Sequence, residues 1–342
     1  MTSMKTNPIE GYLLKDLNGI IFDVKGLVHP PGMVIAFPRF IPDSRGIRRD
    51  EGVTYKKVYS ISERFKFLER NFSKYIVYDP VFDEKLCEIP LTNVKHYYSP
   101  VNRLKELQQS KKLGVLEKKA LRLLEFLRSH TNVPSGKLGI SGSILARLHT
   151  SSSDVDPVIY GSENCRRVHL ALQSMLENED TPFKPYVRED LRTLFDFRSK
   201  DTFMDFEDFA TVESRKVLQG KFMGRDYFIR FVKDWNEINE KYGDVCYKNC
   251  GYAKIEATIA DDSESFFTPC TYKIEEARVV EGTKIEQIQE IASFRGRFCE
   301  QARAGEVVIA QGKIEHVIDK RQNRDYFRLL LGNRPTDYMI LA

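Results

Sequence analysis

The sequence lacks the features that mark membrane and secreted proteins. No run of 18 apolar residues occurs in its 342 residues, and the start of the chain is polar, so neither a transmembrane helix nor a secretory signal is expected. The six cysteines are scattered along the chain, which is not the pattern of a dense disulfide framework. We therefore expect a reduced, cytoplasmic protein that does not bind a membrane.

Several common functional motifs are also missing. There is no P-loop, no G-x-G-x-x-G and no H-E-x-x-H, so the sequence signals of P-loop NTPases, dinucleotide-binding domains and zincin metalloproteases are absent. Lys and Arg number 53 against 49 Asp and Glu. This excess is too small for histone-like or tail-driven nucleic-acid binding, although it permits an anionic partner. The 22 Phe and 16 Tyr exclude a chain that is disordered as a whole.

The chain is long enough for two or three domains, and its pattern changes twice. Short apolar runs between turn residues dominate the first hundred residues. The centre mixes helical periodicity, as in 116–130 and 162–177, with short strands. Short strands punctuated by glycine return at the end. We predict an α+β fold with a β-rich N-terminal domain (1–100), a central domain (101–262) and a small C-terminal module resembling a β-barrel (263–342).

One segment of the central domain carries chemistry. Gly142-Ser143 ends a predicted strand (137–141), ten residues follow, and Asp154-Val155-Asp156 leads into another (155–160). Backbone N–H groups at such a turn favour a phosphate. The alternation of a strand places both carboxylates on one face, where they repel each other unless a cation lies between them. Such oxygen ligands suit Mg²⁺, and two ions would hold the attacking and leaving oxygens of a phosphoryl transfer.

This spacing resembles the nucleotidyltransferase signature of the DNA polymerase beta superfamily. The run GISGSILARLHTSSSDVD, and the later segments FMGRDYFIRFVKDW, GYAKIEATIADDSE and RGRFCEQARAGE, resemble an archaeal predicted nucleotidyltransferase family. The resemblance covers most of the chain and implies a polymerase-beta-like central domain. It implies a metal-dependent enzyme that transfers NMP from an NTP to a hydroxyl and releases pyrophosphate. Gly142 and Ser143 would contact the triphosphate, and Asp154 and Asp156 would hold two Mg²⁺ or Mn²⁺ ions.

The superfamily usually supplies a third carboxylate from a neighbouring strand. Glu256 is the predicted residue, because it lies mid-strand in 252–259, where an acid is unfavourable unless it is paired or metal-bound. The alternative is a salt bridge to Lys254 or another base. Asp226 and Asp234 are weaker candidates because each lies at a strand end.

Basic residues could bind the phosphates of the NTP or of the acceptor. Arg166 and Lys254 are the predicted nucleotide-binding residues, although a solvated helix face would also explain Arg166. Arg230 lies in a strand where basic and aromatic residues alternate, which suits either base stacking or a core strand with charged edges. The basic segment 39–57 is either a solvated hairpin tip or a phosphate-contacting arm.

The signature departs from the superfamily pattern at two positions. Ser141 and Pro157 stand where hydrophobic residues are usual. A proline within a strand removes a backbone donor and is normally confined to edges or bulges. The sequence therefore predicts that the aspartate strand bulges or lies at the edge of its sheet.

The acceptor is open at this point. RNA is the first candidate, because two flanking β-rich modules and many aromatics suit single-strand binding. A protein hydroxyl and a small molecule are the other candidates. The rival hypothesis from another class is a non-catalytic RNA-binding protein that kept the nucleotidyltransferase scaffold.

Overall fold

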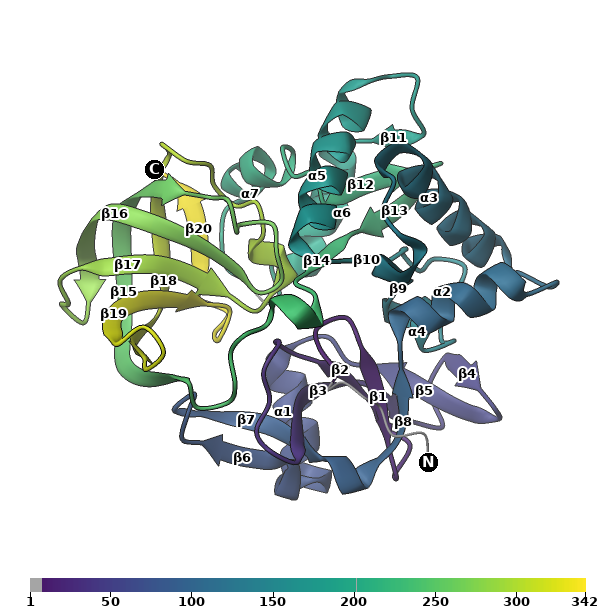
Figure 1. The fold of residues 1–342 in the computed structure, drawn as a ribbon, viewed down its shortest axis with the longest axis horizontal. Helices are drawn as coiled ribbons and strands as arrows, with labels where there is room; N and C mark the ends of the chain where they lie inside the picture. Colours follow the sequence, from purple (N-terminus) through teal and green to yellow (C-terminus); the bar gives the residue numbers. More distant parts are fainter. Residues whose placement is uncertain (1–7, 201) are drawn as a thin grey trace. The chain divides into compact units, whose positions relative to one another are not determined.

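The computed structural model describes residues 8–200 and 202–342 as an α+β chain, which confirms the predicted fold class (Figure 1). The contacts group the chain into two compact units. Unit 1 holds the chain up to Val77, Leu86–Lys184 and Leu218–Asn239, and unit 2 holds Tyr78–Lys85, Pro185–Val217 and Glu240–Ala342. The boundaries of these two units differ from the boundaries of the three predicted domains. None of the described helices is long and apolar enough to span a membrane.

An antiparallel sheet forms the first part of unit 1. Its strand order is β4-β5-β3-β2-β1-β8. The strands are β1 (Leu13–Asp16), β2 (Ile21–Val24), β3 (Met33–Pro42), β4 (Arg48–Asp50), β5 (Val53–Lys57) and β8 (Val94–Tyr98). β7 (Glu84–Pro90) pairs with the start of β3 and with β6 (Ile76–Asp79), and α1 (Ile61–Asn71) follows β5. Leu14, Phe22 and Val24 are buried on one face of this sheet, and Leu13, Ile21 and Phe40 are buried in a second cluster on the other face.

A small central sheet carries the predicted motif. β10 (Pro157–Tyr160) lies between β14 (Arg230–Val232), which is parallel to it, and β9 (Leu138–Ile140), which is antiparallel. Val158, Tyr160 and Val232 belong to the same core cluster as Leu14 and Phe22. The N-terminal sheet and the aspartate sheet therefore share one hydrophobic core inside unit 1.

Four helices and a second small sheet complete unit 1. They are α2 (Pro100–Gln109), α3 (Val115–Thr131), α4 (Gly142–Leu145), α5 (Ser162–Glu177), β11 (Phe183–Lys184), β12 (Gln219–Phe222) and β13 (Arg225–Phe228). The helices predicted over 116–130 and 162–177 are confirmed. In α3 the buried side chains of Leu116, Ala120, Leu123 and Leu127 recur at helical spacing, which explains why this element was readable from the sequence.

A curled sheet dominates unit 2. Its strands are β15 (Val245–Asp261), β16 (Cys270–Gly282), β17 (Ile288–Ser293), β18 (Val307–Asp319), β19 (Arg324–Leu331) and β20 (Tyr338–Leu341). The pairings run β15-β16-β17-β19-β18, and β18 pairs again with β15, so five strands form a ring. Only β17 and β19 are parallel within this ring. The first strand of the ring begins at residue 245, before the predicted start of the C-terminal module.

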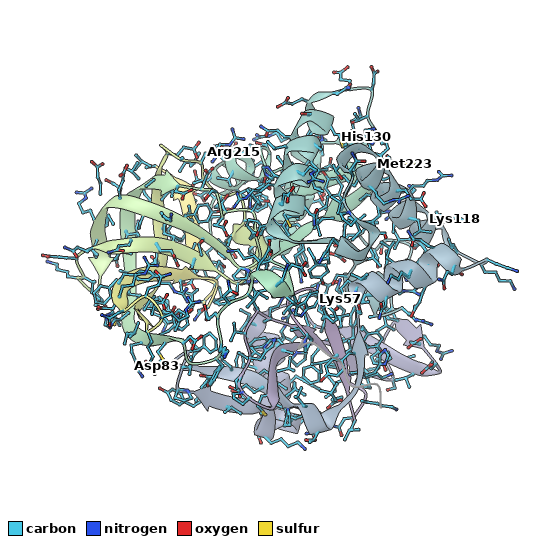
Figure 2. All side chains as sticks on the ribbon, in the orientation of Figure 1. Lys57, Asp83, Lys118, His130, Arg215 and Met223 are labelled. Carbon is cyan, nitrogen blue, oxygen red and sulfur yellow. The ribbon has the colours of Figure 1, made fainter. Side chains whose placement is uncertain are left out.

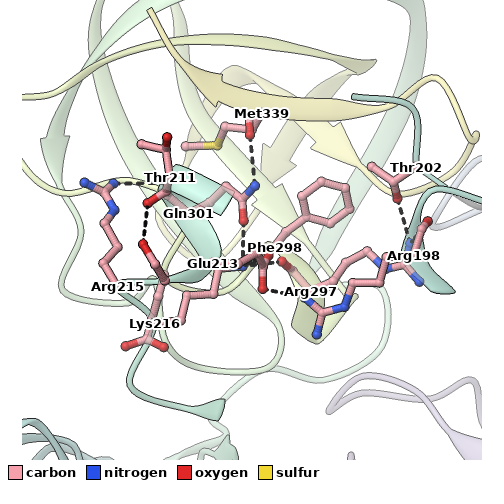
Figure 3. Close-up of polar contacts among 12 residues, drawn as sticks. Arg198, Thr202, Thr211, Glu213, Arg215, Lys216, Arg297, Phe298, Gln301 and Met339 are labelled. Carbon is pink, nitrogen blue, oxygen red and sulfur yellow. Dashed lines mark hydrogen bonds and ion pairs between the residues drawn. The ribbon is translucent and has the colours of Figure 1, made fainter. Parts of the chain in front are cut away.

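Two helices of unit 2 adjoin this sheet through a buried polar network (Figure 3). They are α6 (Arg188–Arg198) and α7 (Phe206–Glu213). Lys216 Nζ lies 2.7 Å from Glu213 Oε1, from Gln301 Oε1 and from the carbonyl oxygen of Arg297, and Gln301 Nε2 donates to the Met339 carbonyl at 2.9 Å. Burial lowers the pKa of Lys216, while the charge of Glu213 opposes that shift. The network ties α7 to β20, so it is a structural feature.

Candidate functional site

Asp154 and Asp156 stand where the chain enters the central sheet. Both side chains are half-buried. The N–H of Ser141 donates to the carbonyl oxygen of Asp156 at 2.8 Å. Gly142 has a φ of +61°, and a Cβ built there would overlap Oδ2 of Asp156. The Gly-Ser turn and the second aspartate are therefore in direct contact, and only glycine allows that contact.

Ser143 contributes a buried hydroxyl beside this contact. Its residue is 1% exposed, and its Oγ has no hydrogen-bond partner in the part of the chain that the structure describes. A buried hydroxyl left unbonded costs on the order of 1–3 kcal/mol, and such groups call for an explanation. A phosphate oxygen at the Gly-Ser turn would supply the missing partner.

Three cations of unit 1 act electrostatically on Asp156: Arg39 of β3, Lys57 of β5 and Arg230 of β14. A fourth cation of unit 1, Arg48 of β4, acts on Lys57. Arg48 is anchored by Nη1, which donates to the Leu148 carbonyl and lies 3.5 Å from Ser153 Oγ. The side chain of Lys57 is marked in Figure 2. Three of the four lie in the basic segment 39–57, so this segment lies on the aspartate side, as the role of a phosphate-contacting arm would require.

The carboxylates and the lysine shift one another's protonation. Burial and the charge of Asp154 together raise the pKa of Asp156 to about 7, against the opposing charges of Lys57, Arg230 and Arg39. Burial and the charge of Arg39 together lower the pKa of Lys57 to about 8, against the opposing charges of the two aspartates. It is therefore unfavourable for both carboxylates to be ionised at once, because each repels the other's charge. A bound divalent cation would remove this repulsion.

Arg230 connects the aspartates to a second set of acids in the N-terminal sheet. Its Nη1 lies 2.8 Å from Glu10 Oε1 and 3.8 Å from Asp23 Oδ1. Lys25 Nζ lies 2.9 Å from an oxygen of each of these acids. Burial would raise the pKa of Asp23, but Lys25 and Arg230 outweigh burial and lower it. No local pattern in the sequence signalled Glu10 or Asp23, because their partner Arg230 is more than two hundred residues away.

The other predicted residues lie elsewhere. Glu256 is on β15 in unit 2, and its carboxylate is 3.0 Å from Arg278 of β16. This ion pair is the alternative that the sequence left open for Glu256. Lys254 lies on the same strand, and Arg166 is an exposed residue of α5 in unit 1. The strands that pair with the aspartate strand are β14 and β9, and β15 belongs to a different sheet.

The two weaker candidates for a third carboxylate do lie in unit 1. The carbonyl of Asp226 accepts from the N–H of Val155 at 3.0 Å, which puts Asp226 beside the aspartate strand. Asp234 forms an ion pair with Lys137. Among the described residues, no group of three His, Cys, Asp or Glu side chains is arranged to hold a metal ion.

The candidate metal ligands in unit 1 are therefore the two carboxylates of Asp154 and Asp156. Mg²⁺ in proteins is usually held by one or two carboxylates together with water and substrate phosphates, rather than by an all-protein cage. Asp154 and Asp156 fit that requirement, and the unbonded hydroxyl of Ser143, the residue after Gly142, offers a donor to a phosphate. The residues thus suit a Mg²⁺ ion that binds together with a triphosphate.

The prediction that Pro157 forces a bulge or an edge is wrong. β10 is the middle strand of its sheet, and Pro157 is its first residue, opposite Ile140. The first position of a strand is one of the few that tolerates proline, because the missing N–H need not join the ladder. The bridge between Val155 and Tyr227 continues the pairing before the proline.

Comparison with known proteins gives one relative over almost the whole length. The chain is 34% identical over 327 residues to the "Uncharacterized protein MJ1086" of Methanocaldococcus jannaschii, covering 93% of this chain and 94% of the relative. The chain belongs to the MJ1086 family. This relationship includes both compact units, and the relative's name attributes no activity to it. No family model matches the chain, and no solved structure matches it.

Proposed function

We propose that the protein is a metal-dependent nucleotidyltransferase that transfers NMP from an NTP to a hydroxyl and releases pyrophosphate. One observation carries the proposal: Asp156 lies against the Gly142-Ser143 turn, and Asp154 stands two residues before it where the chain enters the same strand. The cations around them supply what a triphosphate needs for charge balance. The polymerase-beta-like character of the central sheet belongs to the same proposal.

The chemistry follows from these groups. The acceptor hydroxyl attacks the α-phosphorus, a new oxygen–phosphorus bond forms, and the bond to the bridging oxygen breaks as pyrophosphate leaves. Asp154 and Asp156 would hold the metal, which would supply Lewis-acid polarisation of the phosphoryl oxygens and neutralise developing charge. The Ser143 hydroxyl donates to a phosphate oxygen. Lys57 and Arg39 balance the negative charge of the triphosphate and of the departing pyrophosphate.

The base that removes the acceptor proton remains a prediction. Glu256 is the candidate named from the sequence, in the role of a third metal ligand or general base. Its pairing with Arg278 gives it a competing structural role. Mutation separates the two roles, as described in the Discussion.

RNA is the acceptor that we propose first. The ring of unit 2 has the strand order 1-2-3-5-4 with its third and fifth strands parallel, which is the order of the OB-fold. Five-stranded barrels of that kind bind oligonucleotides and oligosaccharides. The argument is one of fold analogy, and it supports a single-stranded acceptor over a protein hydroxyl or a small molecule.

The rival function is a non-catalytic RNA-binding protein that kept the scaffold. The observation that favours it is the two-carboxylate donor set, because three acids do not gather into a metal site among the described residues. Metal-dependent NTP binding separates the hypotheses. The transferase requires it, and the rival does not.

Label transfer tests the proposal. Each α-labelled NTP is incubated with the protein and Mg²⁺ or Mn²⁺, and label is followed into total RNA, into the protein and into a small-molecule extract. Asp154→Asn and Asp156→Asn are expected to abolish transfer while keeping the fold. Asp180→Asn is the matched control, because Asp180 is an exposed aspartate of the loop after α5. Transfer that persists unchanged in either site variant would overturn the proposal.

A further inference from the structure

We infer that the exposed face of α2 and α3 binds the phosphate backbone of RNA next to the Gly142-Ser143 turn. The inference deepens the proposed function, because it names the surface of unit 1 that holds the acceptor. It rests on the proposed function for the role of that RNA as acceptor. Binding of RNA can be measured without turnover, so the two can fail separately.

The positive charge of the protein is concentrated in these two helices and the loop between them. Residues 100–130 contain eight Lys and Arg against three Glu, a net charge of +5, whereas the whole chain carries +4. The net positive charge of the chain therefore comes from this one segment. A polyanion is attracted to such a local excess even when the protein as a whole is almost neutral.

Most of these cations have no acidic partner in the part of the chain that the structure describes. Arg103 pairs with Glu106 and Glu117, and Lys119 Nζ donates to a backbone carbonyl at 2.9 Å. The other six are exposed and form no ion pair or side-chain hydrogen bond with any described residue. They are called the basic face below: Lys105, Lys111, Lys112, Lys118, Arg122 and Arg128.

The helical repeat turns these side chains away from the core. Lys118, which is labelled in Figure 2, and Arg122 are one turn apart on α3, on the side opposite its buried leucines. Lys111 lies in the loop that joins α3 to α2. The two helices lie side by side (Figure 1), since Arg103 Nη2 of α2 is 2.8 Å from Glu117 Oε1 of α3. The cations of both helices thus belong to one surface.

Two contacts fix α2 next to the predicted phosphate-binding turn. Arg103 Nε donates to the carbonyl oxygen of Ile144 in α4 at 3.1 Å. Gly139 of β9 lies so close to Pro100 at the start of α2 that a Cβ there would collide with it. Both β9 and α4 adjoin the turn, because β9 ends just before it and α4 begins at Gly142. RNA on the basic face therefore lies beside the elements that hold the turn.

The composition of the face favours RNA over a protein or a membrane. Protein interfaces have an apolar centre, and helices that bind membranes insert apolar residues. Within the described helices α2 and α3, the one strongly exposed large apolar side chain is Val115. Exposed amides accompany the cations instead: Asn102, Gln108 and Gln109. Lys, Arg, Asn and Gln are the side chains that contact phosphate and sugar.

The chemistry that fits the face is a phosphodiester backbone. A single strand and a duplex of RNA both offer it. Separate binding measurements with an oligouridylate and with an RNA duplex of the same length distinguish these two forms.

Equilibrium binding of both RNAs to the full-length protein, without NTP and at several salt concentrations, tests the basic face. One variant combines Lys111→Gln, Lys118→Gln and Arg122→Gln, since Gln has a helix propensity close to that of Lys and Arg. For a single strand, each lost phosphate contact lowers the slope of log affinity against log salt by about 0.7. The triple variant should therefore lower that slope by about 2 and weaken binding at low salt by at least about tenfold.

The matched control combines Lys66→Gln, Arg70→Gln and Lys74→Gln. It also removes two lysines and one arginine from exposed positions of unit 1, in α1 and in the turn that follows it. It should keep nearly the slope of the wild type. A second control, Lys111→Arg with Lys118→Arg, keeps the charge of the basic face and should bind RNA as the wild type does.

The outcomes separate this inference from the proposed function. Unchanged RNA binding by the α2–α3 variant, or equal losses in this variant and the α1 control, would overturn the basic face, and label transfer would still decide the transferase proposal. Loss of RNA binding in the α2–α3 variant alone, with no label transferred from any NTP, supports the face on a protein that binds RNA without modifying it. Binding of phosphatidylserine vesicles in place of RNA would overturn RNA as the partner.

Discussion

Gly142 and Asp156 depend on each other at the scale of single atoms. The turn passes so close to the carboxylate that a side chain at Gly142 would occupy its place. The positive φ of Gly142 adds a second reason for glycine, because other residues rarely adopt it. A substitution here acts on the backbone and on the carboxylate together.

Gly142→Ala is expected to destabilise the fold and to displace Asp156, so that Mg²⁺-dependent NTP binding falls below detection. The matched control is Gly52→Ala, since Gly52 also has a positive φ, +83°, but a Cβ there meets nothing within 4 Å. The control should show only the cost of the backbone conformation, roughly 1–3 kcal/mol. Chemical denaturation and NTP binding are the measurements. Equal behaviour of the two variants would show that the contact with Asp156 is unimportant.

His29 is a buried residue whose protonation affects stability. Its Nε2 lies 2.7 Å from the carbonyl of Pro8, and its Nδ1 accepts from the N–H of Ile35 at 3.2 Å. These contacts require a neutral ring with its proton on Nε2. Burial lowers the pKa of His29 to about 4, partly offset by the bond to Pro8.

The folded protein should therefore lose stability as pH falls. His29 in the unfolded chain binds a proton near its ordinary pKa, whereas in the folded chain it resists protonation, so unfolding takes up a proton in acid. The contribution is present above about pH 6.5, declines between there and about pH 4, and amounts to roughly 3 kcal/mol. Urea midpoints of wild type and His29→Gln at several pH values check this. A pH slope that is unchanged in the variant would contradict the assignment.

At the scale of elements, β14 connects the aspartate sheet to the N-terminal sheet. Arg230, its first residue, pairs in register with Val158 of β10 and reaches Glu10. Glu10 has a fully buried side chain, and it also receives Lys25 and the N–H of Gly26. The strand thus carries an ion pair whose two partners depend on each other.

Arg230→Met should destabilise unit 1 strongly, because it leaves Glu10 with less compensation for burial. Breaking a buried ion pair on one side costs roughly 3–5 kcal/mol. Glu10→Gln in the Arg230→Met background should recover part of that loss. Denaturation of both single variants and the double variant gives the coupling energy. Additive effects would mean that the pair does not act as a unit.

Substitutions at Glu256 on β15 and Arg278 on β16 distinguish the two roles of Glu256, a third carboxylate of the site or one partner of a cross-strand ion pair. Their side chains are 39% and 71% exposed, and exposed pairs of this kind contribute about 0–1 kcal/mol. Glu256→Gln should therefore leave the unfolding midpoint nearly unchanged. Arg278→Gln is the matched variant, since it breaks the same pair. Loss of transfer in Glu256→Gln alone identifies the third carboxylate, and equal, small effects in both variants identify a cross-strand pair.

β18 shows how an element can be misread from sequence. The sequence predicted short strands punctuated by glycine in this part of the chain, but β18 runs unbroken through Gly312. A Cβ at Gly312 would collide with the carbonyl oxygen of Leu330 on β19. The glycine marks a close approach of two backbones, and the sequence pattern alone does not separate that cause from a turn.

At the scale of the whole molecule, the two units interleave along the chain. Each is assembled from three separate segments. The ring of unit 2 needs β15, which lies before residue 262, because β15 pairs with both β16 and β18. A fragment that omits β15 exposes the edges of both neighbours.

The fragment 263–342 is therefore expected to remain unfolded or to aggregate. The fragment 240–342 keeps all five strands of the ring, although it lacks Glu84 and Arg215, which pair with Lys313 and Glu306. It should show some cooperative unfolding at lower temperature than the full chain. Circular dichroism during heating compares them. A cooperative transition in 263–342 would show that the C-terminal module folds without β15.

The sequence by itself determined the local features of this protein. The periodicity of 116–130 and 162–177 specified two helices, since the pattern that buries one face lies within each segment. The Gly142-Ser143 and Asp154-Val155-Asp156 segments could be paired from their spacing, because a strand, a turn and a returning strand bring them together over a short loop. Such contacts span few residues, so their cause is visible in the residues themselves.

Only the tertiary structure decided which distant residues join that motif. Lys57, Arg39 and Arg48 come from the N-terminal sheet, and Arg230 comes from a strand more than seventy residues beyond the aspartates. Their approach depends on a core shared by Phe22, Val158 and Val232. No local pattern records which strand will lie next to which, because strand pairing is settled by burial summed over the whole unit. For the same reason, the sequence could not show that Glu256 lies on a strand of a different sheet from the aspartates.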